Sequence, residues 1–285
     1  MTPHLRTHLG LSLKGFHNLA YWEWGPADAE RTVVCVHGLT RQGRDFDVLA
    51  QALVRIGRRV VCPDLAGRGM SDWLADPASY TLLQYGADMN ALLARVGVGE
   101  VDWVGTSLGG LIGMMLAAQP KSPIRRLVIN DIGPLITGAS LRRIGAYLNT
   151  APPRFSDLEA ADAYFREILA PYGELTDAQW RQLTEHSVRP DNDGGYRMRY
   201  DPAIAEAYRP WRLGTVMLWH LWDRVRCPTL VLRGALSDML LSSTAAEMTR
   251  RGPCAALVEF SGRGHVPTLL HEPHIVPVLE FLKSA

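Results

Sequence analysis

Short apolar segments with the character of buried β-strands recur along this chain. Most are continuous apolar runs rather than alternating ones, which is typical of parallel strands covered by helices on both faces. Segments with helical periodicity lie between them, so the alternation predicts an α/β fold with a doubly wound, mostly parallel sheet. The expected strands are 19–24, 32–37, 59–64, 101–105, 126–131, 229–234 and 256–261, and the expected helices are 45–56, 80–96, 108–118, 242–251 and 272–283. Residues 12–24 are expected to hold two short strands in an antiparallel hairpin around Gly15.

The alternation stops between residues 134 and 226, where the pattern is helical. We therefore expect an α/β core made of residues 1–133 and 227–285, with residues 134–226 inserted as a helical cap or lid. The expected helices of the insertion are 139–149, 157–169, 177–187, 202–208 and 211–223. Ser156 and Glu159 are expected to form a capping box, and Thr176 is expected to cap the third helix.

More than half of the aromatic residues of the chain lie in this insertion. Large apolar side chains in a lid favour an apolar pocket beneath it. The same side chains could instead pack the small core of the insertion itself, because a small helical unit needs them to bury enough area. Both alternatives remain open for different faces of the insertion.

Charge and cysteine content exclude several classes of function. The formal net charge is +1 and no basic run occurs, which argues against nucleic acid and polybasic membrane partners. The four cysteines form no C-x-x-C pair and show no zinc spacing, so we expect no metal. The first residues have no apolar signal region, and no stretch of about 18 apolar residues occurs. We therefore expect a cytoplasmic protein that acts on a small molecule.

The segment Gly105-Thr106-Ser107-Leu108-Gly109 fits the G-x-S-x-G pattern of a nucleophile elbow. An expected strand precedes it and an expected helix follows, which is the context that the motif requires. A sharp strand-to-helix turn would expose the Ser107 hydroxyl at the carboxyl edge of the sheet, beside a helix N-terminus that favours negative charge. We expect Ser107 to be a nucleophile.

A serine hydroxyl needs a base to accept its proton, and an acid must orient that base. His265 follows the last expected strand in a glycine-rich loop and is the expected base. Asp238 follows the strand 229–234 and is the expected acid, which gives the chain order Ser107, Asp238, His265. Asp131, at the end of the strand 126–131, is the alternative acid. If it has another role, we expect it to accept hydrogen bonds from backbone N–H groups where the insertion begins.

The negative oxygen formed during acyl transfer needs two fixed N–H donors. We expect them to be the backbone amides of Leu108, next to the nucleophile, and of Leu39, in the loop after the strand 32–37. His37 in the same loop is expected to be structural, with its ring bonded to nearby backbone. Arg41 and Arg44 follow closely, and either could contact a substrate carboxylate or form an ion pair within the protein.

These motifs together resemble the α/β-hydrolase family. The matching segments are HGLT (37–40), DLAGRGMSD (64–72), GTSLGG (105–110), ALSD (235–238) and GRGH (262–265). The resemblance implies an eight-stranded, mostly parallel sheet, a Ser–Asp/Glu–His triad and no cofactor. Members that are haloalkane dehalogenases or epoxide hydrolases have aspartate at the elbow, so the serine here counts against both.

The leading functional hypothesis is a serine hydrolase that cleaves a carboxylic ester or lactone with an apolar portion, through an acyl-enzyme intermediate. One alternative is hydrolysis of a carbon–carbon bond in a meta-cleavage-type diketone. Relatives with that activity often carry Trp after the histidine, whereas this chain has Val266. A second alternative is a ligand-binding receptor that keeps the fold without turnover.

Overall fold

A computed structural model of the chain describes residues 2–208 and 214–283. Eight of its strands form one sheet in the order β1-β2-β4-β3-β5-β6-β12-β13, and the short strands described below form two small separate sheets. The first two strands run antiparallel to their neighbours and the other six are parallel. The strands are β1 (His4–Ser12), β2 (Gly15–Trp24), β3 (Arg31–Val36), β4 (Arg58–Pro63), β5 (Val101–Thr106), β6 (Ile124–Asn130), β12 (Thr229–Gly234) and β13 (Ala256–Phe260). The predicted doubly wound, mostly parallel sheet is confirmed.

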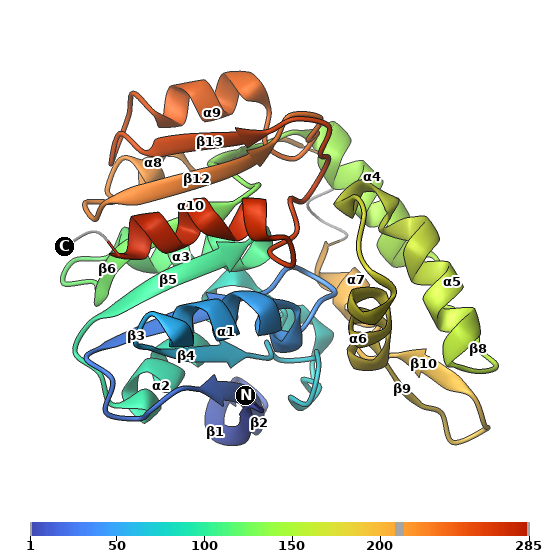
Figure 1. The fold of residues 1–285 in the computed structure, drawn as a ribbon. Helices are drawn as coiled ribbons and strands as arrows, with labels where there is room; N and C mark the ends of the chain where they lie inside the picture. The colour runs from blue at the N-terminus through green and yellow to red at the C-terminus, as the bar shows by residue number, and fades with distance from the viewer. Residues whose placement is uncertain (1, 209–213, 284–285) are drawn as a thin grey trace.

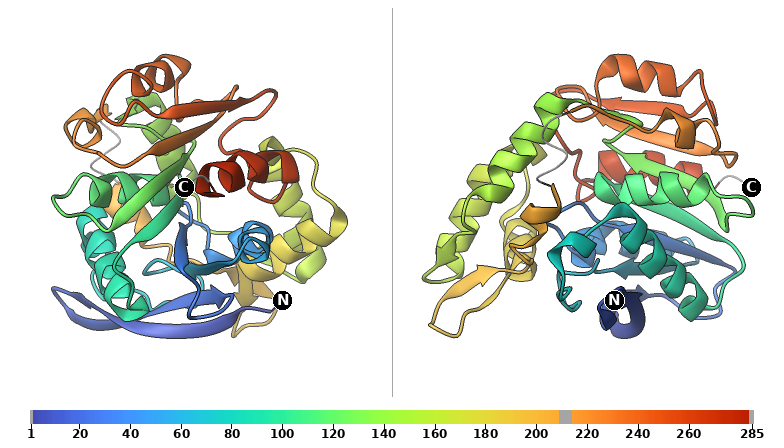
Figure 2. Two further views of the ribbon diagram at one scale, coloured as in Figure 1. Left: turned by 60° about the vertical axis from the view of Figure 1, so that its left-hand side comes forward. Right: turned by 180° about the vertical axis from the view of Figure 1, so that it is seen from behind.

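Helices cover both faces of this sheet (Figures 1 and 2). Side chains of β3 pack alternately against the helices on the two faces of the sheet. Val33 and Cys35 belong to one apolar cluster, and Val34 and Val36 belong to the other. Both faces of the central strands are thus buried, which explains their continuous apolar sequences. The first cluster packs against α1 (Asp47–Arg55) and α10 (Glu272–Lys283), and the second packs against α2 (Leu82–Val96), α3 (Leu108–Ala117), α8 (Trp219–Trp222) and α9 (Ser242–Met248).

Local sequence signals set the ends of these helices. In α2, the Thr81 side chain accepts a hydrogen bond from the Gln84 amide at the N-terminus. Gly97 ends the same helix with φ 72°, a left-handed conformation that a residue without Cβ adopts without strain. Among the described residues, no helix is both long and apolar enough to cross a bilayer.

We call residues 134–226 the insert. Most of its described part stands beyond the carboxyl ends of the sheet strands (Figure 1), whereas Trp219–Trp222 packs against a face of the sheet. Four of the expected helices are present near their predicted positions. The helices are α4 (Gly138–Asn149), α5 (Leu158–Ile168), α6 (Asp177–Ser187) and α7 (Ile204–Tyr208). Short strands lie before, between and after them: β7 (Leu135–Ile136), β8 (Arg154–Phe155), β9 (Val188–Pro190), β10 (Tyr196–Met198) and β11 (Val216–Met217). Single-turn 3₁₀ helices lie at Gly43–Phe46, Pro77–Ser79 and Ala170–Tyr172.

The structure differs from the sequence-based expectation at three places. The expected helix 211–223 is wrong in its described part, because Val216–Met217 pairs with β7 and only Trp219–Trp222 is helical; residues 211–213 lie outside the described residues. The expected Ser156 cap is also wrong, since Asp157 accepts the Ala160 amide instead. The N-terminal hairpin is longer than expected and begins at His4. The expected Thr176 cap of α6 is confirmed.

Candidate active site

Ser107 lies between the end of β5 and the start of α3, at the carboxyl edge of the sheet. Its backbone has φ 50° and ψ −112°, a conformation that non-glycine residues rarely adopt and that is stored strain. Glycines make the turn possible: a Cβ at Gly105 would overlap the Gly109 carbonyl, and one at Gly109 would overlap the Val36 carbonyl. The predicted nucleophile elbow is therefore present in its geometry. The Ser107 hydroxyl makes no hydrogen bond to any described residue and faces a pocket that His265 also lines.

The ring of His265 is held by Asp131. The distance from His265 Nδ1 to Asp131 Oδ2 is 2.7 Å, and the Asp131 side chain is fully buried. Two further donors reach the same carboxylate: the Gly234 amide bonds to Oδ1 at 3.0 Å and the Ser237 hydroxyl to Oδ2 at 2.6 Å. An ionised carboxylate accepts all three bonds at once, so the hydrogen on His265 is fixed at Nδ1 and Nε2 is left to accept a proton.

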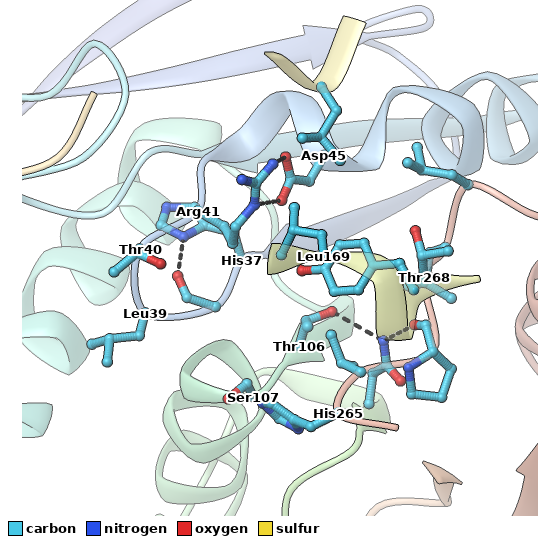
Figure 3. Close-up of a pocket in the computed structure, with 18 of the residues that line it drawn as sticks. His37, Leu39, Thr40, Arg41, Asp45, Thr106, Ser107, Leu169, His265 and Thr268 are labelled. Atoms are coloured by element: carbon cyan, nitrogen blue, oxygen red, sulfur yellow. Dashed lines mark hydrogen bonds and ion pairs between the residues drawn. The ribbon is translucent and has the colours of Figure 1, made fainter. Parts of the chain in front are cut away.

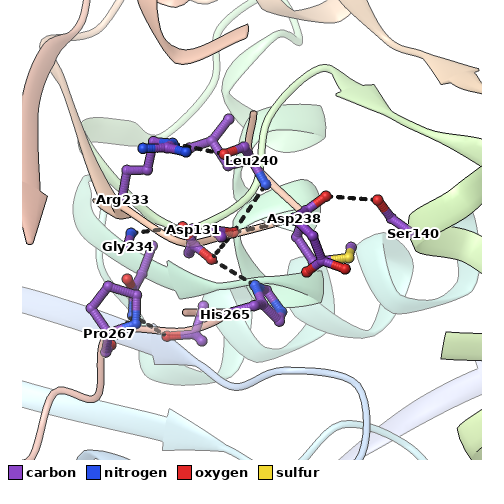
Figure 4. Close-up of polar contacts among 12 residues, drawn as sticks. Asp131, Ser140, Arg233, Gly234, Asp238, Leu240, His265 and Pro267 are labelled. Atoms are coloured by element: carbon purple, nitrogen blue, oxygen red, sulfur yellow. Dashed lines mark hydrogen bonds and ion pairs between the residues drawn. The ribbon is translucent and has the colours of Figure 1, made fainter. Parts of the chain in front are cut away.

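Asp238, the expected acid, lies elsewhere and does not contact His265. Its carboxylate is 51% exposed and pairs with Arg143 of α4, at 2.6 and 2.8 Å. Figure 4 shows the contact between His265 and Asp131, and beside it Asp238, whose backbone carbonyl accepts the Ser140 hydroxyl. The loop after β12 does reach the site, but it delivers Ser237, whose hydroxyl bonds to Asp131. Strands β6 and β12 are neighbours in the sheet, so both aspartates end at the same edge. The positive φ of 57° at Asp131 and the hydrogen bonds from Gly234 and Ser237 turn the Asp131 side chain inward.

A buried amide links the segments on either side of this contact. Asn130 Nδ2 donates to the Pro267 carbonyl at 2.9 Å and lies 3.3 Å from the Thr106 hydroxyl (Figure 3). Thr106 precedes the nucleophile and Pro267 lies two residues after His265. Sequence reasoning did not select Asn130, although its position at the end of a central parallel strand could have indicated it.

The two expected oxyanion donors are in suitable places. Leu108 is the first residue of α3, where a backbone N–H has no partner within the helix. Leu39 lines the same pocket as Ser107, and its amide donates to no described residue. Both N–H groups are therefore free to bind a developing negative oxygen.

His37 fixes the peptide group that carries the Leu39 N–H. Its Nδ1 donates to the Gly38 carbonyl at 2.6 Å, while Nε2 accepts the Leu65 amide at 3.0 Å. Gly38 O and Leu39 N belong to one peptide unit, so this bond orients the donor and polarises it. The next carbonyl, that of Leu39, accepts Nε of the buried Arg68 at 2.7 Å. The structural role expected for His37 is confirmed by these bonds.

Burial lowers the pKa of His37 to about 3, because the charged ring would lose its hydration and lie near the Arg68 and Arg41 cations. The unfolded chain binds the proton near pH 6.5, so stability that is present above that pH is lost as the pH falls toward 3. We expect His37→Asn to flatten the fall in unfolding free energy between pH 6.5 and about 4.5 by about 2 kcal/mol relative to the wild type. Urea unfolding followed by circular dichroism measures this slope. A variant of the exposed His4 is the control, and parallel curves for His37→Asn and wild type would contradict the prediction.

The pocket at the elbow has a volume of about 260 Å³. Its floor comes from the core, through Ser107, His265 and the loop at Leu39. The insert supplies an apolar wall, which includes Ile144, Tyr147, Ile168, Leu169, Tyr172 and Leu183. Other aromatic side chains of the insert, such as Phe155 and Phe165, are buried in its own packing. The aromatic residues of the insert therefore do both things that the sequence left open: some line the pocket and others pack the core of the insert.

Charged side chains are few in this pocket. Arg41 pairs with Asp45 through two hydrogen bonds of 2.7 Å, and Arg143 stands at the α4 side in its pair with Asp238. Arg44 pairs instead with Asp47 and does not line the pocket. Within residues 2–208 and 214–283, no cluster of three or more His, Cys, Asp or Glu side chains is placed to hold a metal ion.

The fold and this pocket define a hydrolase, and the chain belongs to the alpha/beta hydrolase family, whose profile matches residues 33–276. It is 46% identical over 283 residues to a 3-hydroxybutyrate-oligomer hydrolase of Cupriavidus necator, covering 96% of each chain. Among solved structures, a hydrolase from Rickettsia typhi superposes with a TM-score of 0.90 at 31% identity, over 99% of each chain. An alpha/beta hydrolase from Novosphingobium aromaticivorans superposes with a TM-score of 0.86 at 34% identity, again over 99% of each chain.

Proposed function

We propose that this hydrolase is a serine esterase in which Ser107 is the nucleophile, His265 the base and Asp131 the acid that orients it. The 2.7 Å contact between His265 and the buried Asp131, in the pocket that the elbow serine faces, carries this assignment. Asp131 thus replaces Asp238, which is half exposed and paired with Arg143. The Leu39 and Leu108 amides are the proposed oxyanion donors.

The reaction proceeds in two halves. His265 Nε2 accepts the Ser107 proton as the hydroxyl oxygen attacks the ester carbonyl, and the two amides bind the negative oxygen. The imidazolium then gives its proton to the departing alkoxide, which leaves as the alcohol and an acyl-enzyme. In the second half, His265 takes a proton from water, the hydroxide attacks the acyl group, and Ser107 recovers its proton as the acid product forms.

The proposed substrate is a short ester of a small hydroxy acid. Support comes from the relative whose name gives 3-hydroxybutyrate oligomers as its substrate, at 46% identity over nearly the whole chain. A pocket of about 260 Å³ with mostly apolar walls matches small aliphatic units around a polar reaction centre. Because the insert forms one of these walls, we further propose that residues 134–226 act as the lid that closes over the ester.

A fluorophosphonate probe and a substrate panel test this function. We expect the probe to attach to Ser107 in folded protein, as located by peptide mass spectrometry, and a hydroxybutyrate dimer to slow the labelling. The panel contains p-nitrophenyl esters of increasing chain length, hydroxybutyrate dimer and trimer, a lactone and a meta-cleavage dienoate. Absence of labelling together with inert esters would overturn the proposal. Faster turnover of the dienoate than of every ester would contradict the esterase assignment and favour carbon–carbon hydrolysis.

A further inference from the structure

The ion pair between Arg41 and Asp45 forms part of the wall of the catalytic pocket. Figure 3 shows it on the opposite side of the pocket from Ser107 and His265. Arg41 Nε and Nη2 each bond to one carboxylate oxygen of Asp45 at 2.7 Å, and Gln42 Nε2 adds a third bond to this carboxylate at 3.0 Å. Such a bidentate pair fixes the plane of the guanidinium group. The side chains of Arg41 and Asp45 are only 11% and 22% exposed, so the pair is built into the wall and is not a surface bridge.

One corner of the guanidinium group has no acceptor. Asp45 occupies Nε and Nη2, whereas Arg41 Nη1 donates to none of the residues that the structure describes. Some buried polar atoms of the protein lack a hydrogen-bond partner, but Nη1 is not one of them. It therefore has no partner because it is accessible and not because it is enclosed in the interior. The side chain is confined by its neighbours, since the guanidinium carbon lies 6.0 Å from the centre of the Phe165 ring. The group is therefore rigid, nearly buried, and open to the pocket through Nη1.

The surroundings of this corner favour an anion as its partner. The other charged side chains in the pocket lining are Asp45, Arg143 and, when protonated, His265. Arg143 is already neutralised by Asp238, and the remaining lining is mostly apolar. A cationic N–H donor beside apolar walls gains most from a charged acceptor, because the apolar surroundings lower the local dielectric constant.

Resting on the esterase function proposed above, we propose that Arg41, oriented by Asp45, binds a free carboxylate carried by the ester substrate. The substrate class is then an ester with an anionic end, as in a linear oligomer of a hydroxy acid, and not a neutral ester. Nη1 contacts one carboxylate oxygen while the ester carbonyl lies at the Leu39 and Leu108 amides. Arg41 determines specificity and takes no part in proton transfer.

The test compares two substrates that differ only in this charge: the linear dimer of 3-hydroxybutyrate and the same dimer ending in a carboxamide. The readout is the ratio of their kcat/KM values. A charge-assisted hydrogen bond predicts a ratio of about 10–100 in the wild type. Arg41→Gln should bring the ratio close to one, chiefly through a higher KM for the carboxylate substrate.

Asp45→Asn is a second test, in which the ratio of kcat/KM values is not expected to fall. The neutral amide of this variant no longer balances the charge of the guanidinium group, so the preference for the carboxylate should stay or rise severalfold. A purely structural role of the pair would instead lower both rates together. Arg44→Gln is the matched control, because Arg44 lies three residues along, bonds to Asp47 and stacks on Trp22 outside the pocket. Its ratio should equal that of the wild type.

Several outcomes would overturn the carboxylate site: a wild-type ratio near one, an Arg41→Gln variant that slows both substrates equally, or an Asp45→Asn variant with a lower ratio. If Arg41→Gln does not fold, the wild-type and Asp45→Asn ratios decide the question. Hydrolysis of p-nitrophenyl butyrate and fluorophosphonate labelling are measured on the same samples. Positive results there with a ratio near one reject the carboxylate site alone, and negative results reject the esterase function itself.

Discussion

Replacing Asp131 with asparagine is expected to lower kcat/KM for a cleaved ester by about 10³–10⁴-fold. The carboxylate receives His265 Nδ1–H at 2.7 Å, and a neutral amide in its place neither balances the imidazolium charge nor enforces the same tautomer. The loss should appear mainly in kcat, because Asp131 is buried behind the histidine and does not line the substrate pocket. Steady-state kinetics on a p-nitrophenyl ester measure it.

Asp238→Asn is the matched control for this change. Its carboxylate is 51% exposed and bonds to Arg143, so kcat/KM should change less than about threefold. The two aspartates end neighbouring strands, and the pair of variants separates them without altering side-chain size. A larger loss in Asp238→Asn than in Asp131→Asn, with both proteins folded by circular dichroism, would reverse the assignment of the acid.

Ser107→Ala is expected to reduce kcat for esters by about 10⁵-fold or more, because it removes the hydroxyl that is proposed to form the acyl-enzyme. The alanine also removes a hydroxyl that bonds to no described residue, so the fold should remain stable and the substrate should still bind. Rapid acid quenching of the wild type with a slow ester should show the acyl mass on the peptide with Ser107, and the variant should show none. Turnover of the variant within tenfold of the wild type would mean that another group carries the reaction.

The sheet and the elbow were predictable because each depends on short-range sequence. Buried parallel strands need continuous apolar runs such as 32–37, and the turn at Ser107 needs small residues on both sides to avoid backbone overlap. The positions of His265 and of the Leu39 and Leu108 amides follow from the rule that loops at the carboxyl ends of parallel strands meet at one edge.

The acid was harder to predict because that same rule admits both candidates. Asp131 and Asp238 follow adjacent strands, and the inward direction of Asp131 depends on a left-handed backbone conformation and on bonds from Gly234 and Ser237. The insert was partly misjudged for a similar reason. The segment before Trp219 has helical periodicity, but Val216–Met217 pairs with β7, a tertiary contact that overrides local preference.

The buried amide of Asn130 has a consequence for how the catalytic machinery is assembled. It touches the residue before the nucleophile and the segment after the base, and its own neighbour in the chain is the aspartate that holds the base. Hydrogen bonds of the protein thus join segments more than a hundred positions apart in the chain. Groups held in this way need little reorganisation when a substrate binds, so more of the binding energy is available to lower the barrier of the proposed reaction.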